Sequence, residues 1–566
     1  MTDTKTNPMI RLLPSLTDVA FLLPLIFLFG GLRGVRTLLG DGDTGWHVRI
    51  GEWILAHHQA PRKDMFSFTM PNQPFFAWEW LWDVVAAWLH QRWGLGGVVF
   101  ASVLVISFST ALLYRLVYRR CGNPLVAIVL TGLAAAGASI HWLARPHLIT
   151  MLMMVVFPTI LERVREGQTA WLWALPALMI PWTNLHGGFL VGIIIVGTYG
   201  AGELLRALLT SEPDERRHSL RAATGYLAAT VGCALASLVN PYGYHLHTHI
   251  LEYLNDPYQM KYIGEFRGTN FQYPPAIFLE IMLILGLGAT VWHVRHKHFA
   301  ELLMIAGFGH LSLLMVRNMP VYLIAAAPIV AGPLTAWLKA LAAGPFAGRP
   351  RMVFETFVDI GEELNPIERL WRWHIAPVAV ILLLAAGIAS PMAGIKLKPE
   401  YNPAAYPQNA LAALDQSGVR LFEPSQRIFT HDEWGDYLIY KLSPQGFKVF
   451  VDGRSDFYGG KFGQDYIDVM NVKYVWQQTL DRYGVDTILL STDAPLAGAL
   501  KESARWRVAY DDGVAIVFRP VAEAGSRMEQ VFTGSTGGIG SGREITSVKK
   551  GVLEDRLNQI GGIAHP

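Results

Sequence analysis

The sequence predicts an α-helical, polytopic membrane protein with about eleven transmembrane helices, followed by an extracytoplasmic α/β domain at the C-terminus. Apolar stretches of about 18 to 20 residues recur along the first 395 positions, and this length crosses a hydrocarbon core of roughly 30 Å. Only 16% of the residues are charged, whereas soluble proteins contain about a quarter, and 52% are hydrophobic. With 566 residues, the chain is long enough for more than one domain.

The expected transmembrane spans are apolar stretches separated by polar connections. They cover residues 18–38, 95–116, 124–142, 147–162, 170–184, 188–206, 222–240, 276–294, 299–316, 320–340 and 374–395. Lys and Arg concentrate in alternate connections, and basic connections remain in the cytoplasm. This pattern predicts a multi-pass protein of the bacterial inner (plasma) membrane with a cytoplasmic N-terminus. The odd number of spans then places residues 396–566 in the periplasm.

Three units follow from this division of the chain. Residues 1–395 form the transmembrane bundle, and its first outer loop contains juxtamembrane helices within 44–94, where Trp and apolar residues recur at helical spacing. Short apolar runs alternate with helical patterns over 396–523, which predicts a periplasmic α/β domain. Residues 524–566 are rich in Gly and Ser and are predicted to form a flexible tail.

Polar residues that can take part in chemistry gather in the connections predicted to lie on the outer face. Asp41 and Asp43 flank a glycine directly after the first span, and Glu79 begins the second juxtamembrane helix; these three are the candidate catalytic residues. The residues expected to bind substrate or phosphate are Trp46, His47, Arg145, His147, Asn184, His186, Glu265, Arg317 and Asn318. Ionisable groups in membrane segments cost about 2.5–3.5 kcal/mol on insertion scales, so their convergence on one face indicates a functional site.

Each of these motifs also has a structural interpretation. Asp-Gly-Asp at a helix end is a common turn sequence, and the two glycines after His186 can let helices pack closely. Asn240-Pro241-Tyr242-Gly243 is typical of a helix end. Both interpretations stay open for each motif taken alone, and the convergence on one face favours the functional one.

The residue types on this face suit one class of reaction. Asp41 and Asp43 can together bind a divalent cation such as Mg²⁺ or Mn²⁺, the one cofactor expected, or one of them can act as a general base. Arg145 and Arg317 present forked donors that bind phosphate. Carboxylates beside phosphate-binding groups at a lipid interface predict sugar transfer from a lipid-phosphate carrier, with a base activating the acceptor hydroxyl.

The same residues give the chain a resemblance to a known superfamily. An acidic first outer loop, helices along the membrane within it, and a bundle followed by a soluble domain resemble the GT-C glycosyltransferases over most of residues 10–395. The most specific part of the resemblance lies in residues 40–47, 78–80 and 144–147. GT-C enzymes use a polyprenyl-phosphate-linked sugar and place a catalytic Asp in the first loop, which implies that one of the two Asp residues in this loop is the base or a metal ligand.

The outer domain contains a weaker similarity. Residues 432–437 are similar to the Trp-Trp-Asp-Tyr-Gly acceptor-recognition motif of oligosaccharyltransferase catalytic subunits, although here the Gly precedes the Asp. A helix N-terminus capped by an acidic side chain explains this segment without any substrate. The residues expected on the acceptor side are Trp434, Asp436, Tyr437, Asp452 and Arg454.

The predicted function is transfer of a sugar from a polyprenyl-phosphate-linked donor to a glycan, lipid or protein acceptor at the periplasmic face. The expected partners are this donor and membrane lipids, because a net charge of +2 without a basic stripe predicts no nucleic-acid binding. A non-catalytic scaffold subunit of a membrane complex is one alternative, and it would tolerate replacement of Asp41 and Asp43. A transporter or flippase of a lipid-linked substrate is the other, and it would show inverted repeats that meet at mid-membrane.

Overall fold

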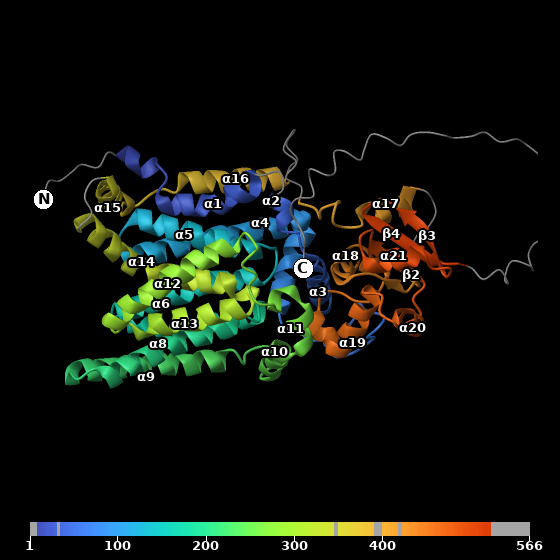
Figure 1. Ribbon diagram of the computed structural model, residues 1–566, viewed down its shortest axis with the longest axis horizontal. Helices are drawn as coiled ribbons and strands as arrows, with labels where there is room; N and C mark the ends of the chain where they lie inside the picture. The colour runs from blue at the N-terminus through green and yellow to red at the C-terminus, as the bar shows by residue number, and fades with distance from the viewer. Residues whose placement is uncertain (1–7, 31–33, 345–348, 390–398, 417–421, 522–566) are drawn as a thin grey trace, which may run out of the picture.

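The computed structural model describes residues 8–30, 34–344, 349–389, 399–416 and 422–521. A long bundle of helices lies beside a smaller α/β domain (Figure 1). The bundle helices run along the long axis of the molecule, and the C-terminal domain, in orange and red, packs at one end of them. This architecture confirms the predicted fold class. The predicted tail at 524–566 lies outside the described residues.

The bundle consists of twelve α-helices within the described ranges. They are α1 (Leu16–Gly30), α4 (Trp80–Cys121), α5 (Pro124–Ala138), α6 (His147–Arg165), α7 (Ala174–Leu185), α8 (Phe189–Leu209), α9 (Pro213–Ala236), α12 (Ala276–Arg295), α13 (Phe299–Leu314), α14 (Met319–Ala343), α15 (Arg349–Glu368) and α16 (Ile375–Ala389). Short 3-10 helices occur at η1 (Pro8–Leu12), η2 (Ser139–His141), η3 (Thr169–Trp173), η4 (Gly264–Phe266) and η5 (Val316–Asn318).

Seven segments of the described chain are long and apolar enough to cross a membrane, fewer than the eleven predicted spans. They are Met9–Phe29, Trp80–Cys121, Pro124–His141, His147–Arg165, Phe189–Leu209, Ala276–Arg295 and Val316–Ala343. The shorter apolar helices Phe299–Leu314 and Ile375–Gly387 coincide with two further predicted spans. The remaining two, at 170–184 and 222–240, correspond to α7, which has 12 residues, and to α9, which begins with a charged section. Length and charge therefore account for the difference.

The second predicted juxtamembrane helix and the second predicted span form one helix, α4, with a break at Gly94. This glycine has φ 61° and ψ −159°, a backbone conformation that side chains with a Cβ rarely adopt. The break lets the first section of α4 turn along the end of the bundle before the second section enters it.

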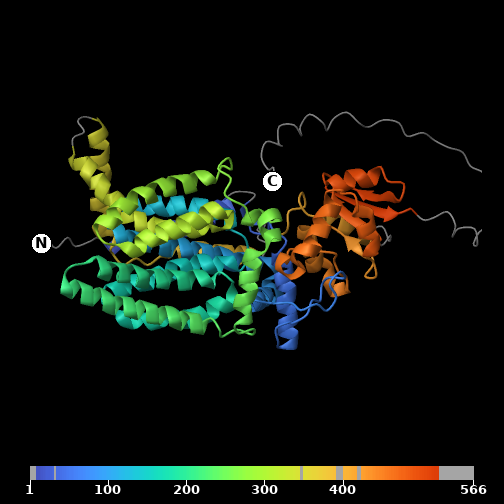
Figure 2. The ribbon, with the colours of Figure 1, turned by 60° about the horizontal axis from the view of Figure 1, so that its bottom comes forward.

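Helices also lie across the end of the bundle that faces the C-terminal domain, called the domain end below. They are α2 (Gly34–Thr37), α3 (Thr44–His57), α10 (His245–Asn255) and α11 (Pro257–Tyr262). In Figure 2, α3 in blue and α10 in green run across the direction of the bundle helices. The predicted juxtamembrane helix after the Asp-Gly-Asp turn is therefore present as α3, which buries Val48 and Ile50.

The C-terminal domain contains a four-stranded sheet in the order β1-β2-β4-β3. Its strands are β1 (Ile428–Phe429), β2 (Thr487–Ser491), β3 (Trp506–Asp511) and β4 (Ala515–Pro520). Strand β1 is parallel to β2, and the other neighbours are antiparallel. The helices of this domain are α17 (Gln408–Gln416), α18 (Asp432–Leu442), η6 (Ser443–Gln445), α19 (Ser455–Met470), α20 (Trp476–Arg482) and α21 (Pro495–Lys501).

Several contacts join this domain to residues 40–79, including the following two. Helix α18 packs on α3, where a Cβ at Gly42 would collide with the backbone oxygen of Glu433. Arg454 donates to Asp452 and, at 2.8 Å, to Asp64 of the loop between α3 and α4. All three of these charged side chains are buried. The acceptor-side candidates Asp452 and Arg454 thus form part of the joint between domain and bundle.

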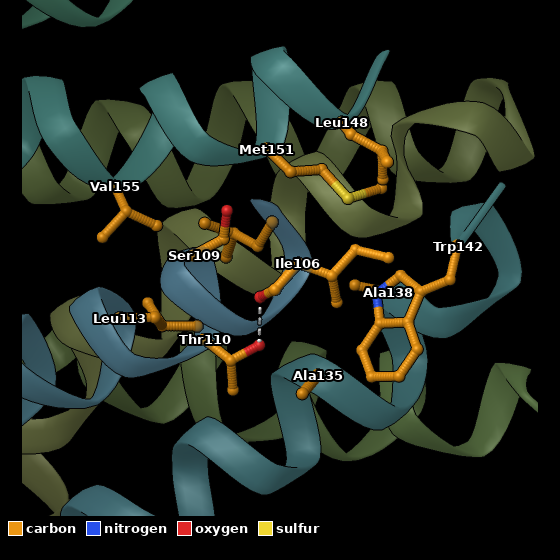
Figure 3. A pocket seen from close by; sticks show the side chains of 11 residues that line it. Ile106, Ser109, Thr110, Leu113, Ala135, Ala138, Trp142, Leu148, Met151 and Val155 are labelled. Atoms are coloured by element: carbon orange, nitrogen blue, oxygen red, sulfur yellow. Dashed lines mark hydrogen bonds between the residues drawn. The ribbon is translucent and has the colours of Figure 1, made fainter. Parts of the chain in front are cut away.

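The bundle interior is closely packed between α4, α5, α6 and α14. A cavity of about 20 Å³ lies there, lined mostly by apolar side chains such as Ile106, Leu148 and Met151 (Figure 3). The hydroxyl of Thr110, which also lines it, donates to the carbonyl of Ile106. A space of this size holds about one water molecule, so it is not a substrate site.

Candidate active site at the domain end

The Asp41-Gly42-Asp43 turn lies at the domain end, between α2 and α3. Arg145 bridges its two carboxylates, because Nη1 lies 2.6 Å from Asp41 Oδ2 and Nη2 lies 2.6 Å from Asp43 Oδ2. Glu265 Oε1 lies 3.6 Å from the same Nη1. Four residues that the sequence predicted to converge therefore do so, and one guanidinium holds three carboxylates.

Local hydrogen bonds fix the direction of both Asp side chains. Asp41 Oδ1 accepts from the backbone N–H of Asp43 at 2.7 Å, the usual bond of an Asp turn. The indole Nε1 of Trp46 donates to Asp43 Oδ1 at 3.1 Å. The turn interpretation and the functional interpretation are thus compatible, since the turn itself presents the carboxylates to Arg145.

Asp43 also meets a carboxyl group of the C-terminal domain, that of Asp436 in α18. The two groups lie side by side at Gly453, where a Cβ would collide with Asp43 Oδ1 and lie 2.7 Å from Asp436 Oδ2. The backbone N–H of Gly453 donates to Asp436 Oδ1 at 2.8 Å. Asp436 is therefore the acceptor-side candidate that the structure brings into the cluster.

Two adjacent buried carboxyl groups cannot both ionise at low cost. Burial raises the pKa of Asp43 to about 7 against the effect of Arg145, and burial together with Asp43 raises the pKa of Asp436 well above its ordinary value. Arg145 contacts Asp43 and stabilises its charge. We therefore assign the shared proton to Asp436.

Glu79 lies between two imidazoles at the start of α4. Its Oε2 is 3.7 Å from His47 Nε2, and its Oε1 is 3.6 Å from His186 Nε2. His47 Nδ1 lies 2.6 Å from Asp83 Oδ1, so that carboxylate holds the imidazole with Nε2 toward Glu79. His186 Nδ1 accepts from the backbone N–H of Gly188 at 3.1 Å, which leaves its proton on Nε2.

Burial makes this group of side chains neutral. It raises the pKa of Glu79 to about 8, although Arg145 and Arg317 lower it. It lowers the pKa of His47 well below the ordinary value and that of His186 to about 3. A protonated Glu79 between an acceptor nitrogen and a donor nitrogen can hold or pass on a proton near neutral pH.

Arg317 supplies an unpaired guanidinium at the same end. It forms no ion pair within the described ranges, and its Nη1 is buried without a hydrogen-bond partner there. Its Cζ lies 4.6 Å from the ring centroid of Phe266. The positive charge of Arg317 lowers the pKa of both Glu79 and Glu265, so Arg317 lies close enough to act on the cluster. A guanidinium with one buried, unsatisfied nitrogen is suited to binding an oxyanion.

Several predicted site residues instead hold the scaffold together. Asn184 accepts from Trp80 Nε1 and donates to the carbonyls of Ile180 and Val239, which uses its amide for joining helix ends. Asn318 donates to the carbonyl of Leu311. His147 donates from Nε2 to the carbonyl of His141 at 2.5 Å.

The acceptor-side candidates Trp434 and Tyr437 also lie in a core, that of the C-terminal domain. Trp434 is 2% exposed, and its Nε1 donates to the carbonyl of Ala405. Tyr437 is 1% exposed and packs against the rings of Tyr401 and Tyr406. Neither side chain presents a surface to an acceptor.

The overall fold is similar to that of a solved oligosaccharyltransferase. The chain is similar to the Archaeoglobus fulgidus oligosaccharyltransferase tethered with an acceptor peptide containing the NVT sequon, with a TM-score of 0.52 and 10% identity over 89% of this chain and 73% of that one. The apo form of that enzyme gives a TM-score of 0.50 and 10% identity over 89% and 74% of the two chains. The chain has a distant GT-C-like fold. No protein-family model and no curated protein sequence matches it.

Within this GT-C-like fold, an arginine lies between the two carboxylates expected to hold a metal ion. No group of three or more His, Cys, Asp or Glu side chains in the described part of the chain is arranged to hold an ion. Arg145 occupies the space between Asp41 and Asp43 that a bridging cation would take. In this arrangement a guanidinium lies where the two Asp carboxylates would share a cation, and the divalent cation expected there stays a prediction.

Three residues of the cluster were not predicted from the sequence. Asp83 lies one helical turn after Glu79 on α4, so the spacing of two acids four residues apart could have indicated it. Thr150 contacts His186 Nδ1 at 2.7 Å from α6, and His141 precedes the Arg145 turn. Neither has a sequence signal that separates it from ordinary helix residues.

Proposed function

We propose that the protein is a membrane glycosyltransferase that transfers a sugar from a polyprenyl-phosphate-linked donor to a hydroxyl acceptor at the domain end. The unpaired Arg317 beside a carboxyl cluster, within a GT-C-like bundle, carries this proposal. In this proposal the domain end faces the periplasm of a bacterial inner membrane, as the distribution of basic residues predicts.

The reaction assigns a separate role to each charged group. Asp41 is the more exposed of the two turn carboxylates, with 24% of its side chain accessible against 9% for Asp43. Asp41 takes the proton of the acceptor hydroxyl, and the hydroxyl oxygen then attacks the anomeric carbon of the donor. The bond between that carbon and the phosphate oxygen breaks, and its electron pair stays on the phosphate. Arg317 binds the phosphate, and protonated Glu79 donates a hydrogen bond to it.

We propose that a cavity of about 880 Å³ beside α3 and the start of α4 accommodates the lipid part of the donor. It is lined by apolar and aromatic side chains including Trp53, Trp80 and Val84, and by the exposed cations Arg62 and Lys63. Trp80, which lines the cavity, directly follows Glu79 in the chain. An isoprenoid chain fits the apolar wall of this cavity.

The acceptor is a glycan or lipid hydroxyl in this proposal. The similar oligosaccharyltransferase was solved with an acceptor peptide. Here, however, the residues that resemble a peptide-recognition motif are buried, so a peptide is the less favoured acceptor.

Transfer assays with the purified, reconstituted protein test the proposal. A panel of polyprenyl-phosphate sugars is offered with glycan, lipid and peptide acceptors, and product is measured for the wild type, Asp41→Asn and Arg267→Gln. Arg267 is an exposed residue near Glu265 and serves as the control. Transfer by the wild type and the control, but not by Asp41→Asn, is expected. Equal transfer by all three proteins would refute the catalytic role of Asp41.

A further inference from the structure

The end of the bundle opposite the C-terminal domain contains a second large cavity. It has a volume of about 610 Å³ and lies between the ends of α6, α8, α9 and α13. In Figure 1 these helix ends lie at the left of the bundle, away from the candidate active site. The cavity therefore takes no part in the proposed transfer reaction.

Cations outnumber carboxylates along the cavity wall. Arg206 Nε and Lys297 Nζ share one carboxylate, that of Glu215, at 3.0 Å and 3.2 Å. Arg221 also lines the cavity and forms no ion pair within the described ranges. Glu203 is the one acidic residue among the described lining residues. Two cations on one carboxylate, together with an unpaired Arg221, leave the cavity positive even when Glu203 is ionised.

A second pair of cations near the inner wall is already neutralised. Arg165 binds both carboxylate oxygens of Glu301. Glu301 also accepts from Arg120 at 2.8 Å, and a second carboxylate, that of Glu162, accepts from Arg120 at 2.6 Å. Glu301 is 1% exposed, so this inner group is a fixed part of the fold. The cations available to a ligand are therefore those nearer the rim.

Lys297 places a basic side chain at this rim in a backbone conformation that is strained for a residue with a Cβ. Lys297 follows the end of α12 with φ 56°, in the left-handed region where Gly is the least strained residue. Its ammonium reaches Thr210 Oγ1 at 3.3 Å as well as Glu215. A glycine would relieve the backbone but would remove this cation.

Apolar side chains beside the cavity are exposed on the outer surfaces of the helices. Leu204 and Leu208 of α8 are 40% and 65% exposed, and Leu220 and Leu227 of α9 are 40% and 41% exposed. In a membrane protein such side chains contact lipid tails. A positive cavity next to lipid-facing leucines has the two parts that a phospholipid needs, one for its phosphate and one for its acyl chains.

We propose that this cavity binds the phosphate headgroup of an anionic phospholipid of the surrounding membrane. Basic pockets between transmembrane helices are a recognised form of headgroup site. The cations at the rim contact the phosphate, and the leucines of α8 and α9 contact the acyl chains. The site is independent of the sugar-transfer proposal, because it lies at the other end of the bundle.

Lipid binding to the full-length purified protein tests this site. The protein in neutral detergent is titrated with phosphatidylglycerol, phosphatidylcholine or inorganic phosphate, and bound lipid is measured by native mass spectrometry together with thermal unfolding. Retention of phosphatidylglycerol and a higher Tm are expected, without either effect from phosphatidylcholine. Equal effects of inorganic phosphate would identify a site for soluble phosphate instead of a lipid. No binding of any of the three would overturn the proposal.

Matched variants distinguish specific binding in the cavity from general electrostatic attraction to a basic surface. Arg206→Gln with Arg221→Gln removes two cations from the cavity. Each cation near a lipid phosphate contributes about fivefold in affinity, so about 25-fold weaker binding of phosphatidylglycerol is expected. Arg216→Gln with Arg217→Gln makes the same change in charge on exposed residues of α9 outside the lining and should preserve binding. Equal losses in both double variants would refute the site.

A third variant guards against loss of folding. Lys297→Gly removes a cation while placing Gly in its preferred backbone conformation, so the protein should unfold at no lower temperature without lipid. About fivefold weaker binding of phosphatidylglycerol is expected. Unchanged lipid affinity in this variant would contradict the role given to the rim cations.

Discussion

Replacement of Glu79 by Gln is expected to stabilise the folded protein, and more so as the pH rises. The pKa of Glu79 is about 8 in the folded protein and 4.5 ordinarily. Below about pH 4.5 both the folded and the unfolded chain hold the proton. Between the two pKa values the unfolded chain releases the proton while the folded protein keeps it, so the wild type loses stability as the pH rises through this window. Gln imitates the protonated side chain at every pH.

The size of this effect follows from the pKa difference. Each unit of pKa difference corresponds to about 1.4 kcal/mol. At pH 7 the substitution should therefore raise the free energy of unfolding by about 3 kcal/mol, and by at most about 5 kcal/mol at pH 8 and above. The Glu79 side chain is 12% exposed, so solvent screens this effect little. Thermal unfolding of wild type and variant at a series of pH values measures the difference.

Glu52 provides a control with the opposite sign. Arg49 and His90 contact its carboxylate at 2.6 Å and 3.2 Å, and their hydrogen bonds lower its pKa despite partial burial. Its contribution to stability is present above the ordinary pKa of 4.5 and is lost as the pH falls. Glu52→Gln should therefore weaken the protein at neutral pH without changing the slope between about pH 5 and 8. Stability curves of wild type and Glu79→Gln that run parallel over this range would refute the protonated state of Glu79.

Five further substitutions, one of them a control, test the joint and the site. Arg454→Met leaves two buried carboxylates unpaired and should lower the free energy of unfolding by roughly 3–5 kcal/mol, whereas Arg505→Gln, in an exposed pair, should change it by less than about 1 kcal/mol in the same thermal assay. Arg317→Gln should raise the KM for the polyprenyl-phosphate donor by about tenfold without lowering Tm, and an unchanged KM would contradict its role as phosphate ligand. Asp41→Asn should abolish transfer in a folded protein, while Asp43→Asn should also lower Tm; the reverse pattern would exchange the two roles.

The sequence was sufficient to predict the fold class and the convergence of much of the site. Apolar stretches of membrane-spanning length predicted the helical bundle. The alternation of basic connections predicted that the polar motifs lie on one face of it. Asp41, Asp43, Arg145 and Glu265 meet as expected because each follows or precedes a helix end on that face. Helix ends are set by local chemistry, and local chemistry can be deduced from sequence.

Contacts that depend on packing could not be deduced in this way. Asp436 reaches Asp43 only because α18 docks on α3, and nothing in the residues around Asp436 specifies that partner. Trp434 lies in a segment, residues 432–437, that is similar to a recognition motif, but its side chain is buried in the core of its own domain. The helices at the spans expected over 170–184 and 222–240 are too short or too charged to count as membrane-spanning. Apolar composition alone does not distinguish a spanning helix from one that packs at the edge of a bundle.

The docking of α18 on α3 also sets the order in which the protein can be completed during synthesis. Arg49 of α3 donates to the carbonyl of Tyr440 in α18, and these residues are 391 positions apart in the chain. A ribosome adding about 5–20 residues per second needs roughly 20 to 80 s to cover this distance. During that interval α3 has been synthesised but α18, which carries Asp436, has not. A chain that ends before α18 therefore lacks Asp436, and the pairing of Asp43 with Asp436 forms only after α18 has been made and has docked on α3.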